Sequence, residues 1–387
     1  MKISSTTTTT IIVNGKTMSN FGEEIYGQTK AVETLHKIYN SGKIPHALLF
    51  YGNEGVGKHF TAVEFVKLLN SNPSKSKSKD LLGKIEKLNE PYVRYVFPLP
   101  RGKGETNDNT ATEKLTPETI EQISGEIVKK SKNPYYNFTI EKANNIKINS
   151  IRDIRKFVSY NFDDIDYRVI LISDAHKMNK EAQNALLKNL EEPPPGFIFI
   201  LMTPYKEQLL QTIVSRCWQI NFNPLTPEII EKILLEYFDV NEFEARKVSS
   251  FANGSVTEAI RLLNKDFDEL LNKTITILRY SLGKRYNTAI NSLNELASDK
   301  SADSYKQILF LIANWFNDVN KNRYNKDEKY PADYIDTLTK FNEKFGKTDL
   351  ISMNNKINYL ESSTDKNVNL NLISLNIILE LASIAKR

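Results

Sequence analysis

A glycine-rich loop is the clearest chemical motif of this sequence. Residues 52–58 read Gly-Asn-Glu-Gly-Val-Gly-Lys and fit the pattern G-x-x-x-x-G-K. In such a loop the glycines let backbone N–H groups converge on phosphate oxygens, and the lysine lies against the outer phosphates. We therefore predict a nucleotide-binding loop that involves Gly52, Gly55, Gly57 and Lys58. A glycine-rich turn without any ligand is the alternative interpretation.

The two positions that should bind magnesium depart from the pattern. The residue after the loop lysine should be Ser or Thr, and it is His59. A carboxylate should follow a buried strand, but the apolar run 169–172 is followed by Ser173 and only then by Asp174. Imidazole is a poor ligand for this oxygen-seeking cation. We therefore expect a degenerate site that requires no cofactor, in which ATP or ADP binding is weak or lost and the chain has no ATPase activity of its own.

Arg216 lies in the tripeptide Ser215-Arg216-Cys217, between a predicted helix and a predicted strand. A single arginine is usually solvated or paired with a carboxylate. An arginine at a domain edge can instead reach the nucleotide of a neighbouring subunit and stabilise charge on the transferring phosphate. Both interpretations stay open on spacing alone.

Thr203 ends a third apolar run, residues 197–202. A hydroxyl at the end of such a strand can sense the γ-phosphate of a bound nucleotide. It can equally be a strand-end hydroxyl that bonds its own backbone neighbourhood. We hold both interpretations for Thr203.

Composition excludes several classes of protein. The 387 residues fit two or three domains, and 52 basic against 47 acidic residues leave a net charge of only +5, so the chain is no polycation. The one cysteine, Cys217, excludes an internal disulfide and a zinc site built from cysteines. No apolar run approaches the roughly 18 residues that span a bilayer. We expect a soluble, cytoplasmic protein.

Three short apolar runs predict buried strands, and helical spacing between them predicts helices on both faces of a parallel sheet. A further alternating segment, 218–222, fits an edge strand. After Pro224 we expect three short helices over residues 227–265 and long amphipathic helices beyond about residue 270. The three apolar runs are residues 47–51, 169–172 and 197–202.

The fold class is therefore α/β plus all-α. The segment 71–115 is polar and locally basic, and we interpret it as an exposed loop rather than a DNA-binding patch. The predicted division is a disordered tail (1–17), a P-loop-like α/β domain (18–223), a small helical domain (224–268) and a larger helical domain (269–387).

A longer motif points to a family. Residues 184–194 read Asn-Ala-Leu-Leu-Lys-Asn-Leu-Glu-Glu-Pro-Pro, and 215–217 follow as Ser-Arg-Cys. With Gly27-Gln28, residues 45–50 and the phosphate loop, they resemble bacterial AAA+ clamp-loader subunits over about residues 20–265. The resemblance implies an AAA+ P-loop sheet, a helical lid formed by residues 224–268 and a C-terminal helical collar for oligomerisation formed by residues 269–387.

Within that family, the positions at which this chain differs from the motor pattern indicate which kind of subunit it resembles. The ATP-hydrolysing gamma/tau motor carries Thr, an Asp-Glu pair and a sensor arginine where this chain has His59, Ser173-Asp174 and Thr257. This pattern resembles the non-hydrolysing delta-prime subunits; a gamma/tau-like motor is the alternative. The resemblance implies that Arg216 acts in trans as an arginine finger.

The resemblance also implies partners. These are the gamma/tau and delta subunits of DNA polymerase III in a pentameric ring, and the sliding clamp and primer-template DNA through that complex, with no membrane. Many relatives carry a four-cysteine zinc module after the helix that follows the phosphate loop. Residues 71–90 contain no cysteine, so we expect no zinc.

Overall fold

The computed structural model describes residues 12–13, 16–17, 21–71, 80–159, 165–263, 266–299, 301–324, 332–364 and 368–385. The chain divides into two compact units, one of residues 1–239 with 254–257 and one of residues 240–253 with 258–387. Most of the predicted tail, 1–17, lies outside the described residues. Its described parts, β1 (Ile12–Val13) and β2 (Lys16–Thr17), pair antiparallel.

A five-stranded parallel sheet forms the centre of the first unit. Its order is β4-β5-β6-β3-β7. The strands are β3 (Ala47–Tyr51), β4 (Val93–Val96), β5 (Arg168–Ile172), β6 (Phe197–Thr203) and β7 (Trp218–Asn221). The register pairs Tyr51 with Thr203 and Ile172 with Leu201. Because all strands are parallel, the residues that follow β3, β5 and β6 lie at one edge of the sheet. The three predicted buried strands and the predicted edge strand are confirmed.

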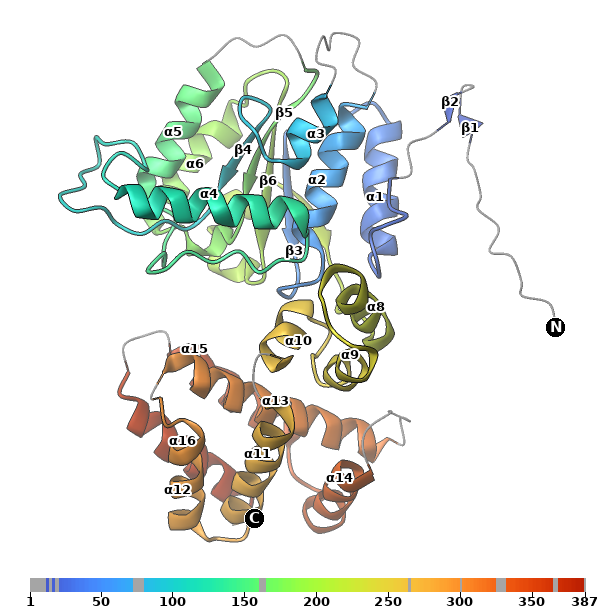
Figure 1. The fold of residues 1–387 in the computed structure, drawn as a ribbon, viewed down its shortest axis with the longest axis vertical. Coiled ribbons are helices and arrows are strands. Elements are labelled where there is room, and N and C mark those ends of the chain that lie inside the picture. The colour runs from blue at the N-terminus through green and yellow to red at the C-terminus, as the bar shows by residue number, and fades with distance from the viewer. Residues whose placement is uncertain are drawn as a thin grey trace. The chain divides into compact units, whose positions relative to one another are not determined.

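Helices cover both faces of this sheet, with α5 and α6 on one face and α1 and α2 on the other (Figure 1). The helices of the first unit are α1 (Thr29–Asn40), α2 (Lys58–Leu69), α3 (Leu81–Glu86), α4 (Pro117–Lys132), α5 (Ile148–Ser159), α6 (Lys180–Glu191), α7 (Gln211–Val214) and α8 (Pro227–Tyr237). Two short 3₁₀ turns, η1 (Ala175–Lys177) and η2 (Lys206–Gln208), follow β5 and β6. The α/β fold class is confirmed.

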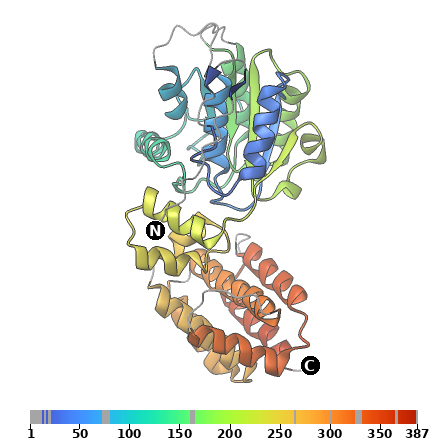
Figure 2. The same cartoon turned by 90° about the vertical axis from the view of Figure 1, so that its right-hand side faces the viewer.

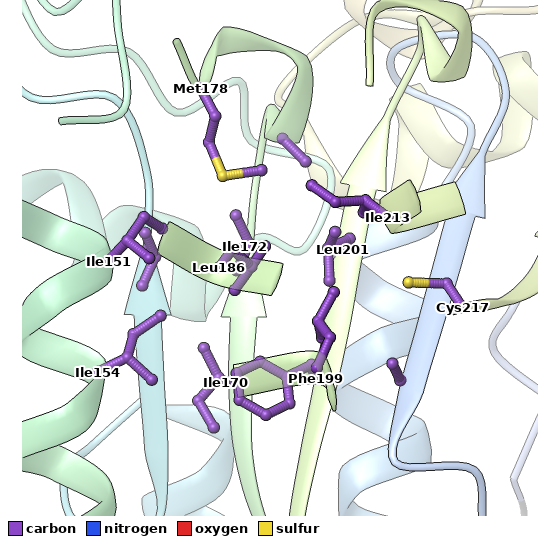
Figure 3. Close-up of a cluster of buried hydrophobic side chains, with 14 of the residues drawn as sticks. Ile151, Ile154, Ile170, Ile172, Met178, Leu186, Phe199, Leu201, Ile213 and Cys217 are labelled. Carbon is purple, nitrogen blue, oxygen red and sulfur yellow. The ribbon is translucent and has the colours of Figure 1, made fainter. Parts of the chain in front are cut away.

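The core of this unit lies between the sheet and the helices α5, α6 and α7. Alternate side chains of a strand point to the same face, so Ile170 and Ile172 of β5 and Phe199 and Leu201 of β6 meet the helices there (Figure 3). From the helices, Ile151, Ile154, Leu186 and Ile213 fill the other side. Cys217 also reaches this core, although the residue before it is exposed.

Residues 71–115 contain more structure than the loop expected there, namely α3 and β4; residues 72–79 lie outside the described part. β4 pairs with β5 and buries Val93 and Val96. The strand has only four residues, and Arg94 and Tyr95 between the two valines are partly exposed. A search for continuous apolar runs therefore passes over it.

Among the described residues of the second unit, the regular secondary structure consists of helices joined by turns and loops (Figures 1 and 2). Its helices are α9 (Glu242–Ser249), α10 (Val256–Leu263), α11 (Phe267–Leu282), α12 (Tyr286–Leu296), α13 (Ala302–Arg323), α14 (Ala332–Phe345), α15 (Leu350–Ser363) and α16 (Leu370–Ile384); the first two residues of α10 belong to the first unit. The three short helices expected over 227–265 are confirmed as α8, α9 and α10. Both units share the segment 224–268, so the predicted lid and collar boundaries stay predictions.

None of the helices in the described parts of the chain is long and apolar enough to cross a membrane.

Candidate functional site

The phosphate loop connects β3 to α2, in the strand–loop–helix order that the motif requires. Gly52, Gly55 and Gly57 have φ angles of +139°, +65° and +93°, which side-chain-bearing residues rarely adopt. Gly52 also approaches other backbone closely, because a Cβ there would lie 2.2 Å from the carbonyl oxygen of Phe222. Gly57 is the N-cap of α2, so the positive end of that helix faces the loop.

Two distant segments hold the loop in place. The buried Gln28 donates from Nε2 to the carbonyls of Val56 (3.0 Å) and Asn223 (2.8 Å), and its Oε1 accepts from the Asn223 N–H (3.0 Å). At the start of α10, the Val256 N–H donates to the Gly55 carbonyl at 3.2 Å. From the sequence, Gln28 was noted only as part of a family motif, and no role was predicted for it.

Lys58 turns its ammonium group back into the loop. Its Nζ donates to the carbonyl of Gly52 at 2.6 Å and also to that of Asn53. Burial lowers the pKa of Lys58 to about 8, and the nearby carboxylates of Glu54 and Asp174 oppose that shift. The ammonium group is thus bound to the loop's own carbonyls at the N-terminus of α2, and its contact with nucleotide phosphates stays a prediction.

The positions expected to bind magnesium are filled by neutral, packed side chains. The ring of His59 lies against that of Tyr95, with 5.3 Å between centroids, and the Tyr95 hydroxyl is 3.0 Å from Ser173 Oγ. Burial holds the pKa of His59 well below its usual value, and the nearby charge of Lys130 lowers it further, so the imidazole is neutral. The Nδ1 atom of His59 is buried and has no hydrogen-bond partner among the described residues.

This donor set does not fit magnesium, which prefers oxygen ligands in octahedral geometry. Asp174 is the carboxylate that follows β5, and Lys177 already binds it at 3.1 Å. Within the described ranges, no group of three or more His, Cys, Asp and Glu side chains could hold a metal ion.

Lys130 is a residue of this region that the sequence did not single out. It lies in α4, is buried, and donates from Nζ to the carbonyls of Pro134 (2.8 Å) and Tyr136 (2.7 Å). Burial lowers its pKa to about 7; the charge of Lys58 lowers it as well, and that of Asp174 opposes both. Its two acceptors flank Tyr135, whose hydroxyl would lie 3.5 Å from a Cβ on Gly57.

Thr203 lies at the predicted strand end and is fully buried. Its Oγ1 is 3.1 Å from His176 Nδ1 and accepts from the Tyr205 N–H at 3.0 Å. Burial lowers the pKa of His176. These contacts fit the interpretation of Thr203 as a strand-end hydroxyl, and a phosphate-sensing role stays a prediction.

Arg216 follows α7 and lies on the surface. Its guanidinium donates from Nη2 to Glu191 Oε1 at 2.8 Å and from Nη1 to the Thr212 carbonyl at 3.0 Å. The side chains of Arg216 and Glu191 are 37% and 48% exposed. The next residue, Cys217, is buried in the core. The backbone beside Arg216 is therefore anchored, while its guanidinium lies at the surface.

Comparison with known proteins gives one family match. The family described as "DNA polymerase III, delta subunit" matches residues 27–226. The tau subunit of DNA polymerase III from Bacillus subtilis (strain 168) is 29% identical over 248 residues, which are 63% of this chain and 37% of that protein. The delta' subunit of the same organism is 27% identical over 254 residues, 65% of this chain and 64% of the relative. The chain thus spans about a third to two thirds of the length of these relatives.

Among solved structures, a gamma-subunit-related protein of DNA polymerase III from Thermotoga maritima has a TM-score of 0.41 to this chain. It is 16% identical, and the match covers 91% of this chain and 99% of the other.

Proposed function

The chain belongs to the DNA polymerase III delta-subunit family, and on that premise we propose that it is a delta-prime-like stator subunit of a bacterial clamp loader. In this role it assists ATP-dependent loading of a sliding clamp onto primed DNA without hydrolysing ATP itself. It presents Arg216 to the nucleotide of a neighbouring gamma/tau motor subunit. Its further partner in the pentameric ring is the delta subunit.

The exposure of Arg216 is the observation that carries this proposal. An arginine finger must leave its own subunit and reach a phosphate, and a guanidinium stabilises the charge that develops there. Glu191 is an exposed partner, and such ion pairs contribute only about 0.2–1 kcal/mol. A polyphosphate can therefore replace Glu191 at little cost.

The residues at the two positions where a motor subunit would bind magnesium support the stator role over the motor role. A motor needs a metal-binding hydroxyl after the loop lysine and a carboxylate after the strand. Here His59, Tyr95 and Ser173 pack together at those positions. The alternative, a gamma/tau-like ATP-hydrolysing motor, is favoured by the glycine loop with Lys58 and by the tau relative.

The test replaces Arg216 by alanine in a loader reconstituted with gamma/tau and delta subunits, clamp and primed DNA. We expect the clamp- and DNA-stimulated ATPase rate to fall at least about tenfold, since an arginine finger accounts for about 10³–10⁵ in rate at the site it serves. The control is Arg246→Ala, which removes an exposed arginine that is also paired with a glutamate, Glu242. The Arg246→Ala loader should keep its rate.

Two results contradict the proposal. If Arg216→Ala prevents assembly of the ring, as measured by light scattering, the residue is structural. If the isolated chain releases phosphate from ATP and Lys58→Ala abolishes that turnover, the chain is a motor.

A further inference from the structure

We infer that the phosphate loop binds a nucleoside polyphosphate in its metal-free form, with the ammonium groups of Lys58 and Lys130 in the place of a magnesium ion. The stator role does not depend on this site, so the two proposals can fail separately. The inference rests on three features of the described residues: the loop geometry, an unpartnered imidazole nitrogen, and a second buried amine.

The loop has the geometry of an anion site. Three left-handed glycines shape it, and α2, which is 12 residues long, begins directly after Gly57. Its first backbone N–H groups have no partner within the helix, so they and the helix dipole favour a negative group. Lys58 adds a positive charge at the same end.

His59 supplies the second, independent observation. Buried polar atoms in folded proteins nearly always have a hydrogen-bond partner, and one that lacks a partner calls for an explanation. The Nδ1 atom of His59 is such an atom, one residue after the loop lysine. A neutral imidazole with its proton on Nδ1 donates to a phosphate oxygen, whereas it cannot replace the oxygen ligand that magnesium requires.

Lys130 places a second cation beside the loop from a different element. Its ammonium binds the carbonyls on both sides of Tyr135, and Tyr135 lies against Gly57 at the N-terminus of α2. The charges of Lys58 and Lys130 interact with each other and with Asp174. A hydrated magnesium ion on the phosphates would be repelled by both amines, while a metal-free polyphosphate is attracted to both.

This arrangement has two measurable consequences. ADP and ATP should bind more tightly when magnesium is removed, the reverse of the behaviour of a motor subunit. Binding should also take up protons near pH 8, because a polyphosphate favours the charged form of amines whose pKa values burial has lowered.

The experiment is a calorimetric titration of the full chain with ADP, ATP or pyrophosphate, in excess EDTA and in excess MgCl₂. Two buffers of different ionisation enthalpy give the number of protons taken up. We expect ADP to bind about tenfold more tightly in EDTA than in MgCl₂, because magnesium on the phosphates would prevent one hydrogen bond between a phosphate oxygen and a charged ammonium group. Tighter binding in magnesium, or no binding in either solution, would overturn the inference. Pyrophosphate binding as tight as ADP binding would support the phosphate contacts as the source of affinity.

Two lysine variants test whether Lys130 contributes to ADP binding. Lys130→Met should weaken ADP binding in EDTA about tenfold, again about one charged hydrogen bond, and should reduce the proton uptake. Lys132→Met, two residues later on the same helix and exposed, is the matched control and should change neither quantity.

Circular dichroism checks the fold of each variant. If Lys130→Met does not fold, His59→Phe decides, because it keeps the ring packing against Tyr95 and removes the donor. It should lower affinity in EDTA severalfold, and unchanged affinity would contradict the inference. Arg216→Ala should leave ADP binding unchanged, which separates this site from the finger.

Discussion

Raising the pH from 7 to 9 should stabilise the first unit against unfolding, because two of its lysines have lowered pKa values. In the folded chain these are about 7 for Lys130 and about 8 for Lys58. In the unfolded chain both return to about 10.4. Below pH 7 both states are protonated, so the cost of burying the charges is fully present. Between pH 7 and 10 the unfolded state binds more protons, and the free energy of unfolding rises with pH.

The size of the effect follows from the pKa of about 7 of Lys130, the more buried of the two lysines. A difference of one bound proton changes the free energy of unfolding by about 1.4 kcal/mol per pH unit. For a group that titrates at pH 7 in the folded chain, this amounts to about 2 kcal/mol between pH 7 and 9. Lys58 acts in the same direction and adds to it.

The single cysteine provides the assay. Cys217 is buried in the core of the first unit, so it reacts only when that unit unfolds. A short alkylating pulse in urea, calibrated at each pH against the fully unfolded chain, gives the fraction unfolded. Lys130→Met should reduce the pH slope by about one proton, while Lys132→Met should keep it. Stability that is flat or falls between pH 7 and 9 would refute the reasoning.

Two further substitutions test the loop and the finger. Gly55→Ala should destabilise the first unit by at least about 1–3 kcal/mol in the same assay, because its Cβ would lie 2.4 Å from the Thr257 backbone nitrogen at a φ of +65°. Gly42→Ala, with a φ of +67° and no atom within 4 Å, measures the backbone strain alone, and equal losses in the two variants would exclude the overlap as a cause. Glu191→Gln should cost about 0.2–1 kcal/mol and leave the ATPase of the assembled loader intact, since Arg216 remains. A loss as large as that of Arg216→Ala would show that the ion pair itself is required.

The sheet could be predicted where its strands are buried on both faces. Such strands appear in the sequence as continuous apolar runs, and β3, β5 and β6 are of this kind. β4 could not be found in this way, since it has only four residues and the partly exposed Arg94 and Tyr95 separate its two buried valines. The helix α4 was missed for a related reason: its charged residues outnumber its apolar ones, and one of the charges, Lys130, is buried.

The sequence could predict those parts of the site whose residues lie close together along the chain. The glycine spacing of the phosphate loop is a local constraint, and the positive φ angles at three glycines follow from it. The role of Gln28 is not local, because one of its partners, Asn223, is 195 residues away in the sequence. The same holds for Tyr95, which reaches Ser173 from a strand that the sequence did not reveal. The sequence therefore shows His59 and Ser173 at the positions where magnesium ligands are expected, but it does not show that Tyr95 packs against them.

The contrast between Arg216 and Lys130 explains why the two cations suit different tasks. Burial lowers the pKa of an amine until it can lose its charge near neutral pH, as with Lys130, whereas a guanidinium keeps its charge in any protein environment. Lys130 is held by two backbone carbonyls and cannot leave its unit, while Arg216 is held by one exposed carboxylate and one carbonyl. A group that acts on another subunit must be both permanently charged and weakly held. Among these two, Arg216 alone meets both conditions, which is why we assign the reaction in trans to it and the binding of an anion in cis to the buried amines.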